Sequence, residues 1–267
     1  MSHHHIIPVL TTPSGSALTA QNWQEAGVQC VSYYLSFLLV KPGMAHLKTL
    51  PDWVLYSGWK GNWVLNASMP RPSVEGRYEF RSPFDGATMQ CSMNDMVEVM
   101  LHLKPTQVML PEGFECAYED VWQRLSTVSQ LFAPALESGQ YMNRPIRGLY
   151  YKIEPMQDLR AIIAKHQSAH PDLDYFFISN ARHAEVAHIE SDQPAKDACL
   201  GIVYCRDGEI SLQDTIYATQ FECIDSSCDC PTCQQQFTRA YLHHLLEHTP
   251  LLCQRYLIQH NLVYSSK

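Results

Sequence analysis

Three cysteines within six residues constrain the C-terminal part of this chain more than any other feature of its sequence. They form a Cys-x-Cys-x-x-Cys spacing, and His260 follows 27 residues after the last of them. Helical patterns over residues 238–247 and 251–259 lie between, so that two packed helices can return His260 to the thiols. Three thiolates and one imidazole complete a tetrahedral zinc shell and leave no position for a catalytic water. The spacing therefore predicts one structural Zn2+ per chain, held by Cys228, Cys230, Cys233 and His260.

Other thiols and imidazoles offer alternative ligands. Cys223 and Cys253 are close enough to compete, and we interpret them as packing residues. His243 and His244 fall on adjacent faces of a predicted helix, so at most one can face the metal, and we interpret both as helix-surface or interface residues. The run His3–His5 is a further candidate, but it lies at a chain end that is expected to fray, or is the remnant of an added tag. A cluster of buried free thiols remains as an alternative to any metal site, and three cysteines so close together argue against it.

The rest of the chain alternates β-like runs with helical patterns. At 267 residues, with 46% apolar and 17% charged residues, it can form a full globular core. The candidate strands cover residues 28–39, 53–56, 107–110, 146–151, 175–178 and 200–205, and the helical patterns cover 93–103 and 156–166. This alternation predicts an α/β fold with parallel strands joined by right-handed crossovers. At this length a (β/α) barrel of the TIM type is expected, with a doubly wound open sheet as the alternative.

The last 45 residues differ in character from the rest of the chain. We therefore expect two domains, a (β/α) barrel over residues 1–222 and a zinc-binding helical appendage over 223–267.

The chain shows no basic segment followed by a long apolar run, and no stretch approaches the roughly 20 apolar residues of a membrane span. We expect a cytoplasmic protein without a membrane partner, whose ten cysteines are thiols or metal ligands rather than disulfides. The net charge of −8 disfavours non-specific attraction to nucleic acid, because phosphate binding depends on clustered Lys and Arg. Any contact with RNA must therefore be local.

The C-terminal sequence resembles the zinc-site ending of the tRNA-guanine transglycosylases. The resemblance covers Cys228-Asp229-Cys230-Pro231-Thr232-Cys233, the helical run 238–245 and His260-Asn261-Leu262, about 40 residues in all. Weaker similarity extends over residues 7–11, 40–43 and 80–86, which are similar to the family's opening strand, a turn and a short hairpin. The resemblance implies a (β/α) barrel that carries this zinc appendage. It also implies exchange of a guanine in tRNA for a 7-deazaguanine base such as queuine.

Compared with the family this chain is about a quarter shorter. The largest loss lies between Glu185 and Asp197, where little room remains for one complete β/α unit, so the barrel is expected to be incomplete or degenerate.

The family's site residues are mostly replaced. Its Asp-Ser-Gly-Gly signature, which supplies one catalytic aspartate, aligns with Tyr56-Ser57-Gly58-Trp59 and so places Tyr56 at the carboxylate position. The purine-reading aspartate aligns with Glu112, and a Gln-Gly pair aligns with Tyr151-Lys152. The nucleophile aligns with Asp197, although the Pro-Thr-Arg expected between it and Arg206-Asp207-Gly208 is absent. The alternative for Asp197 is a helix-cap or loop carboxylate.

These replacements favour a catalytically impaired or accessory member of the family that acts in tRNA queuosine modification. The resemblance implies a homodimer, or a heterodimer with an active transglycosylase subunit, and contact with tRNA or a 7-deazaguanine base. Two alternatives remain. The chain is an active glycosyltransferase or deazapurine glycosidase with a rearranged site, or it binds a deazapurine without chemistry.

Overall fold

The computed structural model describes residues 6–154, 157–182 and 188–266. The run His3–His5, considered as an alternative metal-binding segment, lies outside these ranges. The chain divides into two compact units, one formed by residues 1–29 and 180–267 and the other by residues 30–179. The boundary predicted at residues 222/223 stays a prediction.

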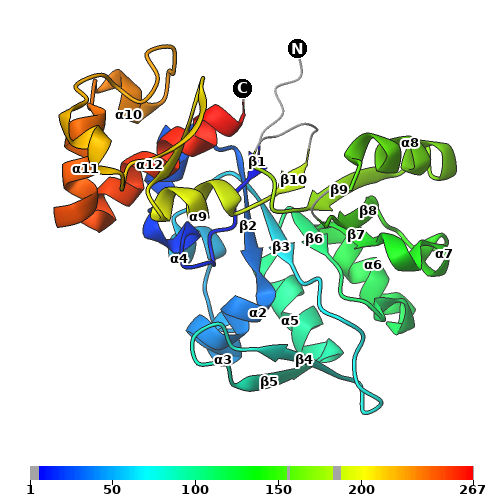
Figure 1. Cartoon of the computed structure of the whole chain (residues 1–267). Helices are drawn as coiled ribbons and strands as arrows, with labels where there is room; N and C mark the ends of the chain where they lie inside the picture. The colour runs from blue at the N-terminus through cyan, green and yellow to red at the C-terminus, as the bar shows by residue number, and fades with distance from the viewer. Residues whose placement is uncertain (1–5, 155–156, 183–187, 267) are drawn as a thin grey trace. The chain divides into compact units, whose positions relative to one another are not determined.

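The second unit is built on six parallel strands in the order β9-β8-β7-β6-β3-β2 (Figure 1). They are β2 (Cys30–Tyr34), β3 (Asn62–Asn66), β6 (Gln107–Met109), β7 (Gln130–Pro134), β8 (Gly148–Lys152) and β9 (Asp174–Ile178). The strands pair in register, for example Val64 with Gln107 and Val108 with Leu131, and are buried on both faces, as is typical of parallel sheets. The fully buried side chains of these strands include Val31, Val64, Leu65, Val108, Met109, Leu149, Phe176 and Phe177.

Helices follow most of these strands. They are α2 (Leu35–Leu38), α3 (Met44–Leu47), α4 (Trp53–Ser57), α5 (Met93–Leu103), α6 (Glu119–Val128), α7 (Ser138–Tyr141) and α8 (Leu159–Ala169). Helix α5 confirms the predicted helix over 93–103, because Ser92 and Asp95 form a capping box and Met96, Val99, Met100 and Leu103 are buried. An antiparallel hairpin of β4 (Arg77–Arg81) and β5 (Thr88–Ser92) precedes α5.

The first unit contains a parallel pair, β1 (Ile6–Ile7) and β10 (Ile189–Glu190), and an antiparallel hairpin, β11 (Ile202–Cys205) with β12 (Gly208–Ser211). Its helices are α1 (Ala20–Glu25), α9 (Gln193–Cys199), α10 (Pro231–Gln234), α11 (Arg239–His248) and α12 (Pro250–Ser265), with a 3-10 turn over Thr215–Thr219. Helices α11 and α12 confirm the two helices predicted between the cysteines and His260. Helix α12 contacts α9, α10, α11 and β11, and so forms the centre of this unit.

Eight parallel strands interspersed with helices confirm the predicted fold class, a TIM-type (β/α) barrel with a C-terminal helical segment that carries the Cys/His cluster. The interval between Glu185 and Asp197 holds a reduced β/α unit, in which the strand has two residues and helix α9 has seven. No helix of the described part of the chain is long and apolar enough to cross a membrane.

One of the predicted strands is wrong, and another lies outside the parallel sheet. Residues 53–56 belong to helix α4, because the Asp52 side chain accepts a hydrogen bond from Leu55 N at 2.9 Å and Gly58 ends the helix in the left-handed conformation. The strand predicted over 200–205 exists as β11, but it pairs with β12 through a two-residue turn and is not part of the parallel sheet.

Candidate functional site

The four predicted metal ligands come together in the first unit. One sulfur or nitrogen atom from each of Cys228, Cys230, Cys233 and His260 lies within 4.8 Å of the others, and all four residues are buried. Cys230 is the N-cap of α10, where its Sγ accepts a hydrogen bond from Cys233 N at 3.3 Å. This three-cysteine, one-histidine group could bind a metal ion, and it is the only group of three or more such ligands among the described residues.

The orientation of His260 favours metal binding. Its Nε2 lies 2.7 Å from the carbonyl oxygen of Tyr204. Because a carbonyl can only accept, Nε2 carries the proton, and the lone pair of Nδ1 points at the sulfurs of Cys230 and Cys233, each 3.4 Å away. The close contacts among the three sulfurs hold the pKa of Cys228 below its usual range and raise that of Cys233, so the thiols titrate as one group.

The alternative ligands lie outside this cluster. Cys253 is buried and its thiol donates to the Leu242 carbonyl at 3.3 Å, and Cys223 is half-buried. His243 is buried with Nδ1 2.7 Å from the Leu212 carbonyl, whereas His244 is exposed.

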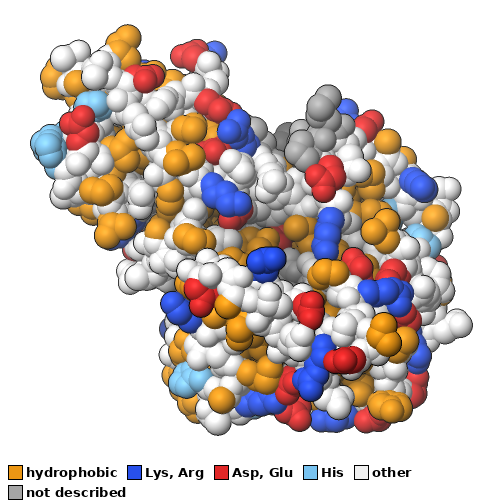
Figure 2. Space-filling model, turned by 60° about the horizontal axis from the view of Figure 1, so that its bottom comes forward, with side chains coloured by type: hydrophobic (Ala, Val, Ile, Leu, Met, Phe, Trp, Pro, Cys, Tyr) orange, Lys and Arg blue, Asp and Glu red, His pale blue; other side chains and the backbone are white. Residues whose placement is uncertain are grey.

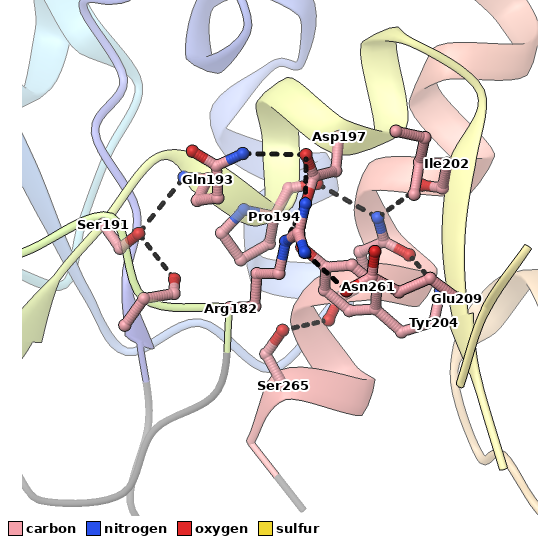
Figure 3. A network of polar contacts seen from close by, with 11 residues as sticks. Arg182, Ser191, Gln193, Pro194, Asp197, Ile202, Tyr204, Glu209, Asn261 and Ser265 are labelled. Atoms are coloured by element: carbon pink, nitrogen blue, oxygen red, sulfur yellow. Dashed lines mark hydrogen bonds and ion pairs between the residues drawn. The ribbon is translucent and has the colours of Figure 1, made fainter. Parts of the chain in front are cut away.

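Asp197 lies in α9, where its side chain is only 3% exposed and is surrounded by donors (Figure 3). Its Oδ2 accepts hydrogen bonds from Arg182 Nε and from the Tyr204 hydroxyl, each at 2.7 Å, and its Oδ1 accepts one from Gln193 Nε2 at 2.7 Å. Burial and the hydrogen bond to Asp197 raise the pKa of Tyr204, so its phenol stays protonated and donates. The nucleophilic role of Asp197 stays a prediction, and it would require these contacts to break.

Glu112 and Tyr151 line one cavity of about 410 Å³ in the second unit. Glu112 follows β6 and is held through its backbone, whose N–H donates to Met69 O and whose carbonyl accepts from the Tyr78 hydroxyl, both at 3.0 Å. The Tyr151 hydroxyl lies 2.8 Å from His166 Nδ1. Burial raises the pKa of Tyr151, so the phenol is a donor here.

Tyr56 lies on α4 rather than at the end of a strand, and 46% of its surface is exposed. Its ring contacts His46 and Trp53. The carboxyl ends of the strands are where barrel enzymes place their catalytic groups, so α4 is an unusual place for a catalytic residue. A substrate-binding role for Tyr56 stays a prediction.

Comparison with known proteins connects this geometry with a family. A family model described as queuine tRNA-ribosyltransferase matches residues 186–267, which include the Cys/His cluster. A queuine tRNA-ribosyltransferase of Blochmanniella floridana is 21% identical over 98% of this chain and 84% of its own length. One of Treponema denticola is 22% identical over 97% of the chain and 82% of its own length. A third, of Clostridium perfringens, is 34% identical over 28% of the chain and 19% of its own length.

The chain is similar to the queuine tRNA-ribosyltransferases. The resemblance inferred from the zinc-site motif is thus confirmed over nearly the whole sequence. The match with the Blochmanniella protein extends over 322 residues, more than the 267 of this chain, so it includes gaps in the shorter sequence.

The family's Asp-Ser-Gly-Gly signature has a second candidate place, which sequence reasoning missed. Strand β3 ends at Asn66, and Ala67-Ser68-Met69 follows at the strand end where barrel chemistry is located. Ser68 then matches the serine of the signature, and Ala67 stands in place of the aspartate. Ala67 is fully buried and its N–H donates to Met109 O at 3.0 Å. The sequence feature that could have located this position is the apolar run before Asn66, which we did not predict as a strand.

Glu190 is the second residue that sequence reasoning missed. It ends β10 with its side chain completely buried, and Pro194-Ala195-Lys196 follows four residues later. That tripeptide keeps the proline and a cationic residue of the expected Pro-Thr-Arg, which makes Glu190 a second candidate for the nucleophile beside Asp197. Two carboxylates thus lie at strand ends, Glu112 after β6 and Glu190 at the end of β10, and both are glutamates.

Proposed function

We propose that this chain is a queuine tRNA-ribosyltransferase-like protein of tRNA queuosine modification that does not exchange bases on its own and acts as an accessory subunit in the cytoplasm. The reaction is taken from the names of the similar proteins, and one observation supports the loss of catalytic activity. The residues that follow β3 are Ala67, Ser68 and Met69, and none of them is a carboxylate. Base exchange at a glycosidic bond needs a nucleophilic carboxylate and a second group for proton transfer, and removing one member of such a unit removes most of the acceleration.

Two other observations support loss of the reaction. Asp197 is engaged by three side-chain donors, which leaves it unsuited to attack a ribose. On the face shown in Figure 2, Lys and Arg side chains are interspersed with Asp and Glu and form no continuous basic surface. A uniform basic surface is what supplies affinity for a nucleic-acid backbone.

We also propose that Cys228, Cys230, Cys233 and His260 hold a structural zinc ion. Soft thiolates with one imidazole are the donor set that zinc takes in closed tetrahedral sites. When bound, the ion would cross-link the loop before α10 to α12 without an open position for chemistry.

The second candidate function is an active enzyme with a rearranged site. It is favoured by Glu190, whose carboxylate is buried at a strand end, and by Asp192, whose Oδ2 is buried without a hydrogen-bond partner among the described residues. A buried acceptor without a donor is costly unless a substrate supplies one.

We expect no measurable incorporation of radiolabelled guanine into unmodified tRNA by the isolated protein. The physical reason is the missing carboxylate after β3. An active family member serves as the positive control, and Glu190→Gln and Ala67→Asp are assayed beside the wild type. Turnover by the wild type that disappears in Glu190→Gln would establish the active-enzyme alternative, with Glu190 as the nucleophile.

We propose that the partner, a second copy or an active family member, docks on apolar side chains that the first unit exposes. They are Ile216, Phe221, Tyr241, Leu251 and Leu252. Leu242 of α11 is buried within its own unit and does not belong to this surface.

We expect Leu251→Ser combined with Leu252→Ser to shift the protein to the monomer in analytical ultracentrifugation, because both side chains lose apolar contact area. The matched control is Leu55→Ser, which changes a leucine of the second unit that is as exposed as Leu251. A strictly monomeric wild type at high micromolar concentration, with no binding to a purified active family member, contradicts this proposal.

A further inference from the structure

Two exposed histidines lie one helical turn apart on α11. The ring centroids of His244 and His248 are 4.4 Å apart and their planes are inclined by 53°. Residues four apart share one face of a helix, so both imidazoles point to the same region of solvent. We propose that His244 and His248 form a second, exchangeable metal site, distinct from the Cys/His cluster, that takes a late first-row divalent ion such as Ni2+, Cu2+ or Zn2+.

The chemistry of the pair fits such an ion. Imidazole nitrogens are ligands for zinc, copper and nickel, and two histidines at i and i+4 with a glutamate between them is the arrangement by which helices in metalloenzymes hold zinc. Here the glutamate is Glu247, whose Oε2 lies 3.9 Å from His248 Nε2. Its negative charge favours a cation at this end of α11.

The site has two protein ligands rather than three or four. Within the described residues, the Cys/His cluster is the only group in which three or more ligand atoms converge. Water would therefore complete the shell around an ion on His244 and His248, which makes binding weaker and the ion exchangeable. This separates the pair from a closed structural site.

Two other histidine arrangements in the described residues show why the ring nitrogens of this pair are accessible and those of the others are not. His243 adjoins His244 in sequence, but it is buried and its Nδ1 is engaged by the Leu212 carbonyl. His166 and His170 have the same spacing at the end of α8, with ring centroids 5.7 Å apart. However, both ring nitrogens of His166 are engaged, Nδ1 by the Tyr151 hydroxyl and Nε2 by the Leu173 carbonyl. Spacing alone does not make a chelate, because the ring nitrogens must also be accessible.

The test is a titration of the full-length, zinc-loaded protein with Ni2+ in an isothermal calorimeter. The run His3–His5 is replaced by alanine in every variant, because it is a competing ligand. We expect one Ni2+ per chain to bind with zinc retained. Even loss of an outer-shell partner of a metal ligand typically weakens binding 10–100-fold, so His244→Ala and His248→Ala should each weaken it by at least about tenfold. His170→Ala is the matched control and should leave binding unchanged.

Both variants change exposed side chains, so their unfolding temperatures without nickel should equal that of the parent, which shows that any lost binding is not lost folding. Nickel affinity that is the same in the parent, His244→Ala and His248→Ala overturns the proposal. Release of zinc in proportion to nickel bound also overturns it, since the ion would then be entering the Cys/His cluster.

Discussion

Replacing Cys230 by serine is expected to abolish metal binding and to unfold residues 223–264. Cys230 has no exposed surface, and its sulfur both faces His260 and caps α10. A structural zinc ion contributes on the order of 10–16 kcal/mol of apparent folding free energy in small zinc-dependent segments. Serine keeps the size of the side chain but offers zinc a poor ligand, so most of that contribution should be lost. Metal analysis and thermal unfolding of the two proteins measure it.

Cys223→Ser is the matched control for this prediction. Cys223 lies seven residues from Cys230, is half-buried and does not belong to the four-residue cluster. It should therefore keep a full complement of zinc and nearly the wild-type unfolding temperature. If Cys230→Ser does the same, the four residues do not form a metal site.

We expect Asp197→Asn to lower the free energy of unfolding by about 3 kcal/mol. All three side chains that contact the Asp197 carboxylate donate hydrogen bonds to it, and none accepts one; they are Arg182, Gln193 and Tyr204. An amide must turn its own NH2 group toward at least one of them, which leaves two donors facing each other. Breaking a buried ion pair costs about 3–5 kcal/mol, and we take the lower end because the Arg182 side chain is 39% exposed. Chemical denaturation monitored by tryptophan fluorescence measures the change.

The control is Glu209→Gln, which removes the second carboxylate bound to Arg182. Glu209 lies 2.6 Å from Arg182 Nη1 but is 42% exposed, so its loss should cost no more than about 1 kcal/mol. Equal effects of the two substitutions would show that burial of Asp197 contributes nothing. A large stability loss in Asp197→Asn also means that reduced activity of that variant would not identify a nucleophile, whereas Glu190→Gln tests the strand-end carboxylate directly.

The metal cluster could be predicted from the sequence because its information is local. Three cysteines in six residues have few structural uses other than metal binding, and the two helices between them and His260 follow from a 3.6-residue apolar pattern. The alternation of strands and helices gave the fold class for the same reason. Neither inference depends on which residues far apart in the sequence come into contact in the folded chain.

The positions proposed for catalysis could not be predicted in this way. Residues 53–56 form a short apolar run, which periodicity cannot assign to strand or helix, and treating it as a strand moved the family signature to Tyr56. Glu190 lies on a strand of two residues, which is too short to produce any pattern. The donors around Asp197 come from positions 182, 193 and 204, and only the folded chain brings them together.

Tyr204 takes part in both polar centres of the first unit. Its carbonyl oxygen accepts the hydrogen bond from His260, and its hydroxyl donates to Asp197, each at 2.7 Å. Groups that share a partner in this way have a coupling free energy, and linkage makes that coupling reciprocal. Metal occupancy at His260 should therefore strengthen the contacts of Asp197, and loss of the Asp197 carboxylate should weaken metal retention. In a double-mutant cycle, the losses of unfolding free energy caused by disrupting the two centres would therefore not add. The first unit would then unfold as one cooperative unit after either change.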